Sequence, residues 1–550
     1  MNRSRSDRKA RREAERQERK AGAASGKASL RADWKWALGL TLLAWIHRIF
    51  FLRSNRDWSW PYTIFYEGDS ETFYRYARSL LAGRLYDNGI PFHPPGFAWL
   101  LAGIHTLVGA GSPEDRVPYF AVKVVTALVG SLPVGLLYLL VKPYLGRTIA
   151  LAASLLALYH FGLYVLAVAP LTEGTYLALL SLALLVWSRK MDHPLSAPGS
   201  APGGWKAALV LGILLGALAL TRAEGVLIAG ILVGTGLVGG LRRRRETGFA
   251  VLRPWALVAA GWILAVAPWA ARNAIHLSEM NERLAGQLAE PLPTFVPLTI
   301  YGPLNLALAN NREANGTFSR DFLASRAHSP VLDLTDREHL EFILHGDRLA
   351  RKWILENPGD FARLVLRKWA LFFSAWKLGW TQWNVPSGLT GTRWPVDVFL
   401  PDSPAALALS LPFTALGLLY GLAIPGAPRR WAILVLLLTA AGMVTTGLFF
   451  GYARLGLLVL LFWLTWTATG LVWIAERLIH RERGWSRTLQ DLSPSPTLLR
   501  ALGGVVIALF LLEAWGATTD RNYRATGTNV PGQTYLDRDQ PVELEVIKEE

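Results

Sequence analysis

Long apolar runs recur along this chain and are separated by polar segments. The strongest runs are 16–24 residues long, close to the roughly 20 residues that an α-helix needs to cross about 30 Å of hydrocarbon. Two weaker runs, Phe97–Val108 and Leu364–Trp380, are short or carry charges, as interfacial helices do. The pattern predicts an all-α polytopic integral membrane protein with 11, or up to 13, transmembrane helices. The eleven strong runs are Trp36–Leu52, Val117–Leu140, Thr148–Ala169, Leu171–Trp187, Trp205–Leu220, Gly225–Leu241, Pro254–Ala270, Ala405–Ile424, Trp431–Phe450, Leu455–Ala475 and Thr497–Trp515.

The composition agrees with a membrane protein. Of 550 residues, 52% are hydrophobic and only 18% are charged, whereas soluble domains carry about 25% charged residues. These values exclude an ordinary soluble enzyme and a disordered chain. The chain has no cysteine, which excludes thiol catalysis, thiolate zinc sites and disulfides.

The net charge of +16 is concentrated at the N-terminus and in short loops. Residues 1–35 hold 12 Lys/Arg and 5 Asp/Glu. We interpret them as a disordered basic cytoplasmic arm that lies on anionic lipid, with an RNA-binding arm as the alternative. The polar segment before Trp36 is too long for a cleaved signal peptide, so the first run is an expected signal anchor. The charge excess therefore indicates membrane lipids and not nucleic acid as the partner.

The loop charges predict the topology. With the N-terminus in the cytoplasm, eleven crossings place most basic loops in the cytoplasm, including the four arginines 242–245, as the positive-inside rule requires. The transmembrane domain then covers residues 36–515. Its outer face receives a first outer loop (53–116), a large outer loop (271–360) and an extracytoplasmic C-terminal tail (516–550).

The first outer loop carries the most informative polar residues. Apolar spacing predicts a short amphipathic helix from Glu71 to Ala82, ended by Gly83, with Asp69 or Ser70 as its N-cap. Asp69 at a helix N-terminus would stay ionised, and it would be able to take a proton from an incoming hydroxyl. The alternative is that Asp69 only caps the helix. With Glu67 two residues earlier, the two acids would be able to share a divalent metal or to raise one another's pKa.

A proline-rich segment follows that helix. His93 lies between Phe92 and two prolines, which hold the chain in a rigid non-helical conformation. No second histidine is close in sequence, so a structural or substrate-contacting role is favoured over metal binding.

Five further charged residues lie where apolar runs reach the outer face. They are Glu173, Arg222, Glu224, Arg272 and Arg454. Each alone fits snorkelling or an interhelical ion pair, but the topology brings all of them to the same side as the first outer loop. Guanidinium groups bind phosphate oxygens in a bidentate fork, and a carboxylate can act as the general base. The set therefore predicts glycosyl transfer from a polyprenyl-phosphate sugar, and the chain has no glycine-rich nucleotide loop.

Several of these segments, taken in order, resemble the GT-C superfamily, and most closely its bacterial branch related to protein O-mannosyltransferases and the aminoarabinose-lipid A transferase. The resemblance covers roughly residues 36–310. It departs where Ser70 follows Asp69 and where no proline follows Arg454. The segments are Gly68-Asp69-Ser70 with Tyr74, Ala77 and Gly83, Pro91-Phe92-His93-Pro94-Pro95-Gly96, Pro170-Leu171-Thr172-Glu173, Thr221-Arg222-Ala223-Glu224-Gly225, Pro268-Trp269 with Arg272-Asn273, and Tyr301-Gly302-Pro303-Leu304-Asn305.

The resemblance implies a GT-C-like helical bundle with juxtamembrane helices in the first outer loop. It implies that Asp69 is the catalytic base and that Glu173, also a catalytic residue, orients the acceptor or the base. Arg222, Arg272 and Arg454 are then the candidates for the donor phosphate. It further implies inversion at the sugar and no nucleotide donor. Substrate contacts are expected at Glu67, Tyr74, His93 and Glu224.

The partners implied are a polyprenyl-phosphate-linked sugar and an acceptor lipid, glycan or protein at the outer face of the cytoplasmic membrane. No cofactor is certain, and a divalent metal remains an option. One alternative is a transporter or lipid-glycan flippase, which would place ionisable groups near the bilayer midplane. The other is an inert scaffold, in which single outer acids would be replaceable.

Overall fold

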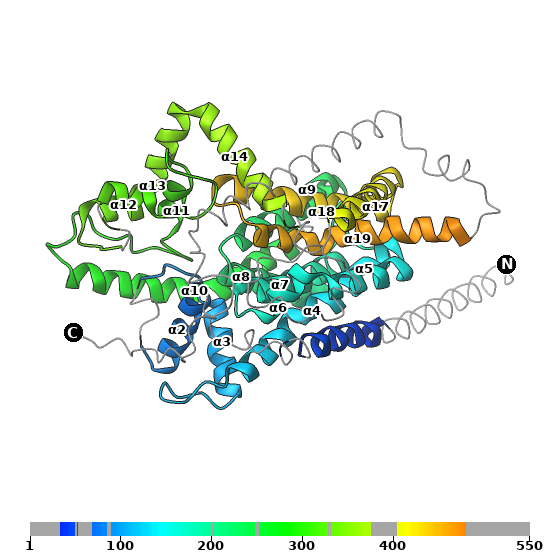
Figure 1. Ribbon diagram of the computed structural model, residues 1–550, viewed down its shortest axis with the longest axis horizontal. Coiled ribbons are helices and arrows are strands. Elements are labelled where there is room, and N and C mark those ends of the chain that lie inside the picture. Colours follow the sequence, from blue (N-terminus) through cyan, green and yellow to red (C-terminus); the bar gives the residue numbers. More distant parts are fainter. Residues whose placement is uncertain are drawn as a thin grey trace, which may run out of the picture.

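The structure is a computed structural model that describes residues 33–49, 52, 69–84, 90–200, 203–247, 252–327, 329, 332–373, 375 and 404–479. Within these ranges the regular elements are helices, with no β-strand (Figure 1), which confirms the all-α prediction. Most of the predicted N-terminal arm, the run Thr497–Trp515 and the tail 516–550 lie outside the described residues. The first helix covers residues 33–49, so it includes the last three residues of that arm.

The remaining helices follow in chain order. They are α2 (Asp69–Leu81), α3 (Gly96–Leu107), α4 (Tyr119–Leu145), α5 (Arg147–Tyr159), α6 (Phe161–Val168), α7 (Thr172–Lys190), α8 (Gly204–Thr221), α9 (Gly225–Thr247), α10 (Arg253–Arg283), α11 (Gly302–Ala309), α12 (Asp321–Ala327), α13 (Arg337–Glu356), α14 (Pro358–Phe373), α17 (Pro404–Ala423), α18 (Ala427–Leu448) and α19 (Ala453–Ile479).

Several of these helices are long and apolar enough to cross a bilayer. Among the described residues five meet this condition, in α4, α8, α10, α18 and α19, and a sixth arises if the bent pair α5–α6 forms one span. The protein is therefore a multi-pass membrane protein. The predicted number of eleven crossings stays a prediction, because part of the chain lies outside the described ranges.

One predicted run is broken in the structure. The sequence predicts a single helix over Thr148–Ala169, but α5 ends at Tyr159 and α6 leaves it at an angle of 72°. His160 has extended backbone angles at the break, and its Nδ1 accepts a hydrogen bond from the amide of Leu163 at 3.4 Å. The histidine thus caps the first turn of α6. The pattern of apolar residues does not predict a break of this kind.

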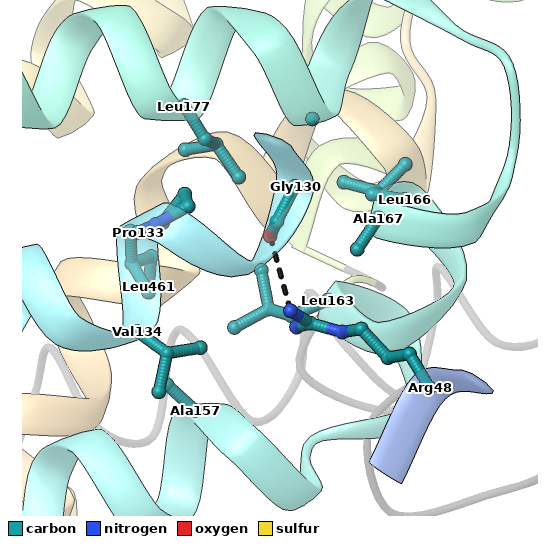
Figure 2. A pocket seen from close by; sticks show the side chains of 11 residues that line it. Arg48, Gly130, Pro133, Val134, Ala157, Leu163, Leu166, Ala167, Leu177 and Leu461 are labelled. Carbon is teal, nitrogen blue, oxygen red and sulfur yellow. Dashed lines mark hydrogen bonds between the residues drawn. The ribbon is translucent and has the colours of Figure 1, made fainter. Parts of the chain in front are cut away.

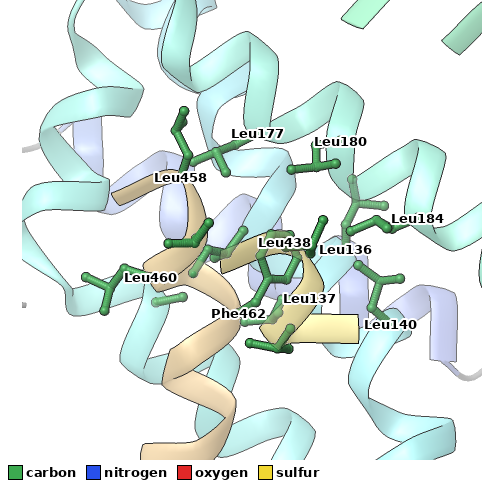
Figure 3. Packing of buried hydrophobic residues seen from close by; sticks show 14 of the residues in the cluster. Leu136, Leu137, Leu140, Leu177, Leu180, Leu184, Leu438, Leu458, Leu460 and Phe462 are labelled. Atoms are coloured by element: carbon green, nitrogen blue, oxygen red, sulfur yellow. The ribbon is translucent and has the colours of Figure 1, made fainter. Parts of the chain in front are cut away.

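The main core of the bundle includes side chains of α4, α7, α18 and α19. Figure 3 shows leucines of α4 and α7 meeting Leu438 of α18 and Phe462 of α19. These helices come from distant parts of the chain, and the first turn of α7 lies beside the first turn of α19. That end of the bundle carries Glu173 and Arg454.

A second group of helices lies beyond one end of the bundle. Helix α10 runs unbroken to Arg283, so helical structure occupies the beginning of the predicted loop 271–360. Helices α11, α12 and α13 gather beside this extension (Figure 1), where their apolar side chains form a separate core with Phe450. We call α11–α14 with their connecting loops the outer layer, after the predicted topology.

The two helices of the predicted first outer loop pack against the bundle. Helix α2 begins at Asp69, two residues before the predicted start. Asp69 and Ser70 therefore lie in its first turn, and the prediction that one of them is the N-cap is wrong. Gly83 ends the helix with a positive φ of 67°, which glycine adopts without strain. Helix α3 has 12 residues, too few to cross the bilayer. A Cβ atom at Gly96 would lie 2.8 Å from the carbonyl oxygen of Leu220, so glycine lets α3 approach the end of α8 that carries Arg222.

Candidate active site

Glu173 lies at the centre of a charged cluster. It occupies the first turn of α7 and is fully buried, where the helix N-terminus favours its negative charge. One carboxylate oxygen accepts a hydrogen bond from Arg222 at 2.7 Å and lies 3.5 Å from the Nε of Arg454. The other oxygen accepts from the hydroxyl of Thr172 at 3.3 Å.

Arg222 connects Glu173 to a second acid. The residue follows the last residue of α8, in an extended conformation. Its guanidinium donates to Glu173, to the hydroxyl of Thr172 at 2.8 Å, and to the carboxylate of Glu224. Burial alone would lower the pKa of Arg222, but Glu224 and Glu173 together raise it above its ordinary value. The guanidinium therefore stays charged at any working pH.

Arg454 reaches the same carboxylate from the other end of the chain. It lies in the first turn of α19, after the turn that follows α18, and its guanidinium lies 5.3 Å from the ring centre of Tyr452. The structure thus brings together Glu173, Arg222, Glu224 and Arg454, as the topology predicts. We call these four residues the charged cluster. Their formal charges cancel, which fits a site that is largely buried.

Arg272 makes different contacts. Its guanidinium lies 4.8 Å from the ring centre of Trp269, and it donates to Asn273 at 3.2 Å. Trp269 in turn donates to the carbonyl of Leu298 at 2.7 Å. These contacts tie α10 to the loop that follows it, so the structure places Arg272 on this junction and not on Glu173.

His93 lies among aromatic side chains. Its Nδ1 lies 2.9 Å from the hydroxyl of Tyr76 on α2, and its ring is 5.6 Å from that of Tyr301. The histidine therefore joins α2 to the segment before α11. These contacts are structural, and the substrate contact expected at His93 stays a prediction.

Tyr74 lines a small cavity between α2, α3 and α4. The cavity has a volume of about 10 Å³, close to what a single water molecule needs. Its walls include His105 and Lys123, both buried, and Tyr119, whose hydroxyl lies 3.2 Å from that of Tyr74. Burial, followed by the nearby charge of Arg78, lowers the pKa of His105 to about 4. The imidazole is therefore neutral at physiological pH.

The predicted base and its neighbour are less fully described. Asp69 is the first residue of α2, and its side chain lies outside the part of the chain that the structure describes. Glu67 lies outside the described residues altogether. Their predicted roles therefore stay predictions. Among the described residues there is also no group of three metal-binding side chains.

Sequence reasoning missed a buried arginine close to the cluster. Arg48, near the end of the first helix, is 1% exposed and donates to the carbonyl of Gly130 at 3.2 Å (Figure 2). It also donates to the hydroxyl of Ser131. It lines a cavity of about 10 Å³ together with Gly174, the residue after Glu173. An arginine inside an apolar run is itself a signal of function or of a specific partner, and that signal was available in the sequence.

The chain matches a known family over part of its length. The model of the dolichyl-phosphate-mannose-protein mannosyltransferase family matches residues 92–271. This stretch includes His93, Glu173, Arg222 and Glu224. The match confirms, over this stretch, the resemblance predicted from the sequence. None of the curated proteins matches the chain.

Solved structures similar to this chain include those of the Archaeoglobus fulgidus oligosaccharyltransferase. The form tethered with an acceptor peptide is 15% identical, with a TM-score of 0.41, and the match covers 88% of this chain and 55% of that one. The apo form is 15% identical, with a TM-score of 0.39, and covers 88% and 56%. The form in complex with an inhibitory peptide and a dolichol-phosphate is 15% identical, with a TM-score of 0.40, and covers 88% and 56%. The chain thus spans just over half the length of these proteins.

Proposed function

We propose that this protein transfers a sugar from a polyprenyl-phosphate donor to a hydroxyl acceptor at the outer face of the cytoplasmic membrane, with inversion at the sugar. The observation that carries the proposal is the charged cluster. Two arginines, one directly after α8 and one in the first turn of α19, converge on one buried carboxylate. The family match over residues 92–271 includes two of the three residues concerned.

The cluster suits the leaving group of such a transfer. Polyprenyl phosphate departs with extra negative charge, which two fixed guanidinium groups stabilise without reorganisation. Arg222 and Arg454 are held in place by Glu173 and Glu224 before any substrate arrives. Both carboxylate oxygens of Glu173 are engaged, so its contacts favour positioning of the arginines over proton transfer.

The general base is assigned to Asp69. In this proposal Asp69 removes the proton from the acceptor hydroxyl, and the resulting oxygen attacks the anomeric carbon. The bond between that carbon and the phosphate oxygen breaks in the same displacement, and polyprenyl phosphate leaves. A single displacement of this kind inverts the sugar configuration.

Comparison of cell-envelope glycans tests the proposal and identifies the substrates. Mass spectrometry is applied to cells that carry the wild-type chain, the Asp69→Asn variant or no copy. We expect one glycan to lose a sugar both in the deletion and in Asp69→Asn, with the variant still made and still binding polyprenyl phosphate. Wild-type glycans in Asp69→Asn would remove this residue from the mechanism. Purified protein in liposomes that moves the lipid-linked sugar across the bilayer without forming a glycosidic product would identify a flippase instead.

A further inference from the structure

The turn between α18 and α19 is held by the outer layer. The amide of Gly451 donates to the carbonyl of Gly316 at 2.7 Å, and the hydroxyl of Tyr452 accepts from the amide of Phe318 at 2.7 Å. The side-chain amide of Asn310 donates to the carbonyl of Leu448, also at 2.7 Å. Three hydrogen bonds thus fix the turn from which α19 and Arg454 begin.

A buried lysine completes this junction. Lys368 lies in α14 and is fully buried. Its ammonium donates to the side-chain oxygen of Asn310 at 2.9 Å and to the carbonyl of Gly447 at 3.2 Å. Neither acceptor is charged, and no carboxylate pairs with this ammonium in the described ranges. A buried cation without an anion costs stability, yet here its two hydrogen bonds join α14, the end of α11 and the end of α18.

The backbone of α14 touches the same turn. A Cβ atom at Gly451 would lie 2.6 Å from both the Cα and the carbonyl oxygen of Lys368. Only glycine permits this approach. The turn therefore contacts the backbone of Lys368 as well as its side chain. Three residues later, Arg454 reaches the carboxylate of Glu173. A displacement of the turn therefore moves this guanidinium relative to the charged cluster.

We propose that Lys368 is a positioning residue: through Asn310 and the turn from Gly447 to Tyr452 it holds Arg454 against Glu173, and so couples the outer layer to the charged cluster. The effect on turnover rests on the proposed glycosyl transfer. The effect on geometry does not.

A pair of substitutions tests the effect on turnover. Lys368→Met removes both donated hydrogen bonds at nearly constant volume, and we expect transfer to fall by about 10- to 100-fold, as for a misplaced catalytic contact. In an Arg454→Gln background the same substitution should cause no further loss, because it acts through Arg454. Lys352→Met, on the exposed face of α13, is the matched control and should change the rate less than about twofold, the size of an ordinary surface substitution. An equal loss in both backgrounds, or no loss in either, would overturn the proposal.

A distance measurement tests the geometry without any activity. The chain has no cysteine, so a pair of cysteines can be introduced in one protein, at Arg312 in the outer layer and at Leu107 on α3, both exposed. Spin labels on the two cysteines report the distance between the outer layer and α3. We expect Lys352→Met to keep the wild-type distance distribution and Lys368→Met to broaden or shift it. If Lys368→Met does not fold, Asn310→Ala is expected to show the same shift. An unchanged distribution in the folded variant would overturn the coupling. If the wild type transfers no sugar, the proposed function fails while this measurement still decides the coupling.

Discussion

Replacing Glu173 by glutamine perturbs the charged cluster at its centre. The substitution keeps the size of the side chain and one oxygen acceptor but removes the negative charge that faces two guanidinium groups. Breaking one partner of a buried ion pair costs about 3–5 kcal/mol. Arg222 keeps Glu224 as a partner and is 18% exposed, which reduces the penalty. We therefore expect Glu173→Gln to destabilise the protein by about 2–4 kcal/mol.

A double-mutant cycle isolates the pair. Glu173→Gln, Arg222→Gln and the double variant are unfolded reversibly in mixed detergent micelles, and the coupling free energy is taken from the four stabilities. The contact of 2.7 Å between a fully buried carboxylate and a mostly buried guanidinium predicts a coupling of about 2 kcal/mol. The pair Arg312–Glu313, at 3.4 Å with Arg312 75% exposed, is the control and should give less than about 1 kcal/mol. If Glu173 and Arg222 couple no more strongly than this surface pair, the reasoning on the cluster is wrong.

Three further predictions concern the surroundings of the cluster. Burial lowers the pKa of Lys368 from 10.5 to about 7, so the unfolded state binds more protons between these values and stability rises with pH across that window. Lys368→Met lacks this group, so its free energy of unfolding should fall behind that of wild type by about 2–4 kcal/mol between pH 7 and pH 9.5, as measured by thermal unfolding. A difference between the two proteins that does not change with pH would contradict the burial of a titrating ammonium. Gly96→Ala should cost about 1–3 kcal/mol because its Cβ meets the α8 backbone, whereas Gly103→Ala on the same helix, with open space around it, should be neutral or slightly stabilising; equal effects would argue against the close approach. Tyr76→Phe removes the hydroxyl 2.9 Å from His93 and should lower stability by about 0.5–1.5 kcal/mol, and an unchanged melting temperature would show that this contact contributes nothing.

The positions of charged residues predicted the charged cluster because the membrane topology depends on local features of the sequence. Apolar runs and loop arginines indicate which residues reach the outer face, and Glu173, Arg222 and Arg454 do meet in the structure. Arg272 lies at a similar run end, but Trp269 provides an aromatic surface one turn earlier and holds its guanidinium there. Charge alone does not distinguish these two environments, because the choice depends on a neighbour's side chain.

Other features depend on contacts between distant segments. The break at His160 arises because a side-chain nitrogen competes with the helical pattern, while the surrounding residues remain uniformly apolar. Lys368 lies in a weak amphipathic run and would be expected to face water or headgroups. Its burial becomes visible only when α14 is packed against Asn310 and the turn at Gly451.

The central claim is that the base and the guanidinium groups face the same side of the membrane, away from the cytoplasm. Since the chain has no cysteine, a single cysteine can be placed at Asp69 or at Arg222 and labelled in intact cells with a membrane-impermeant maleimide. The account predicts that both positions react from outside, with labelling at Arg222 slower because the site is largely buried. Labelling of one position only from the cytoplasmic side would contradict it.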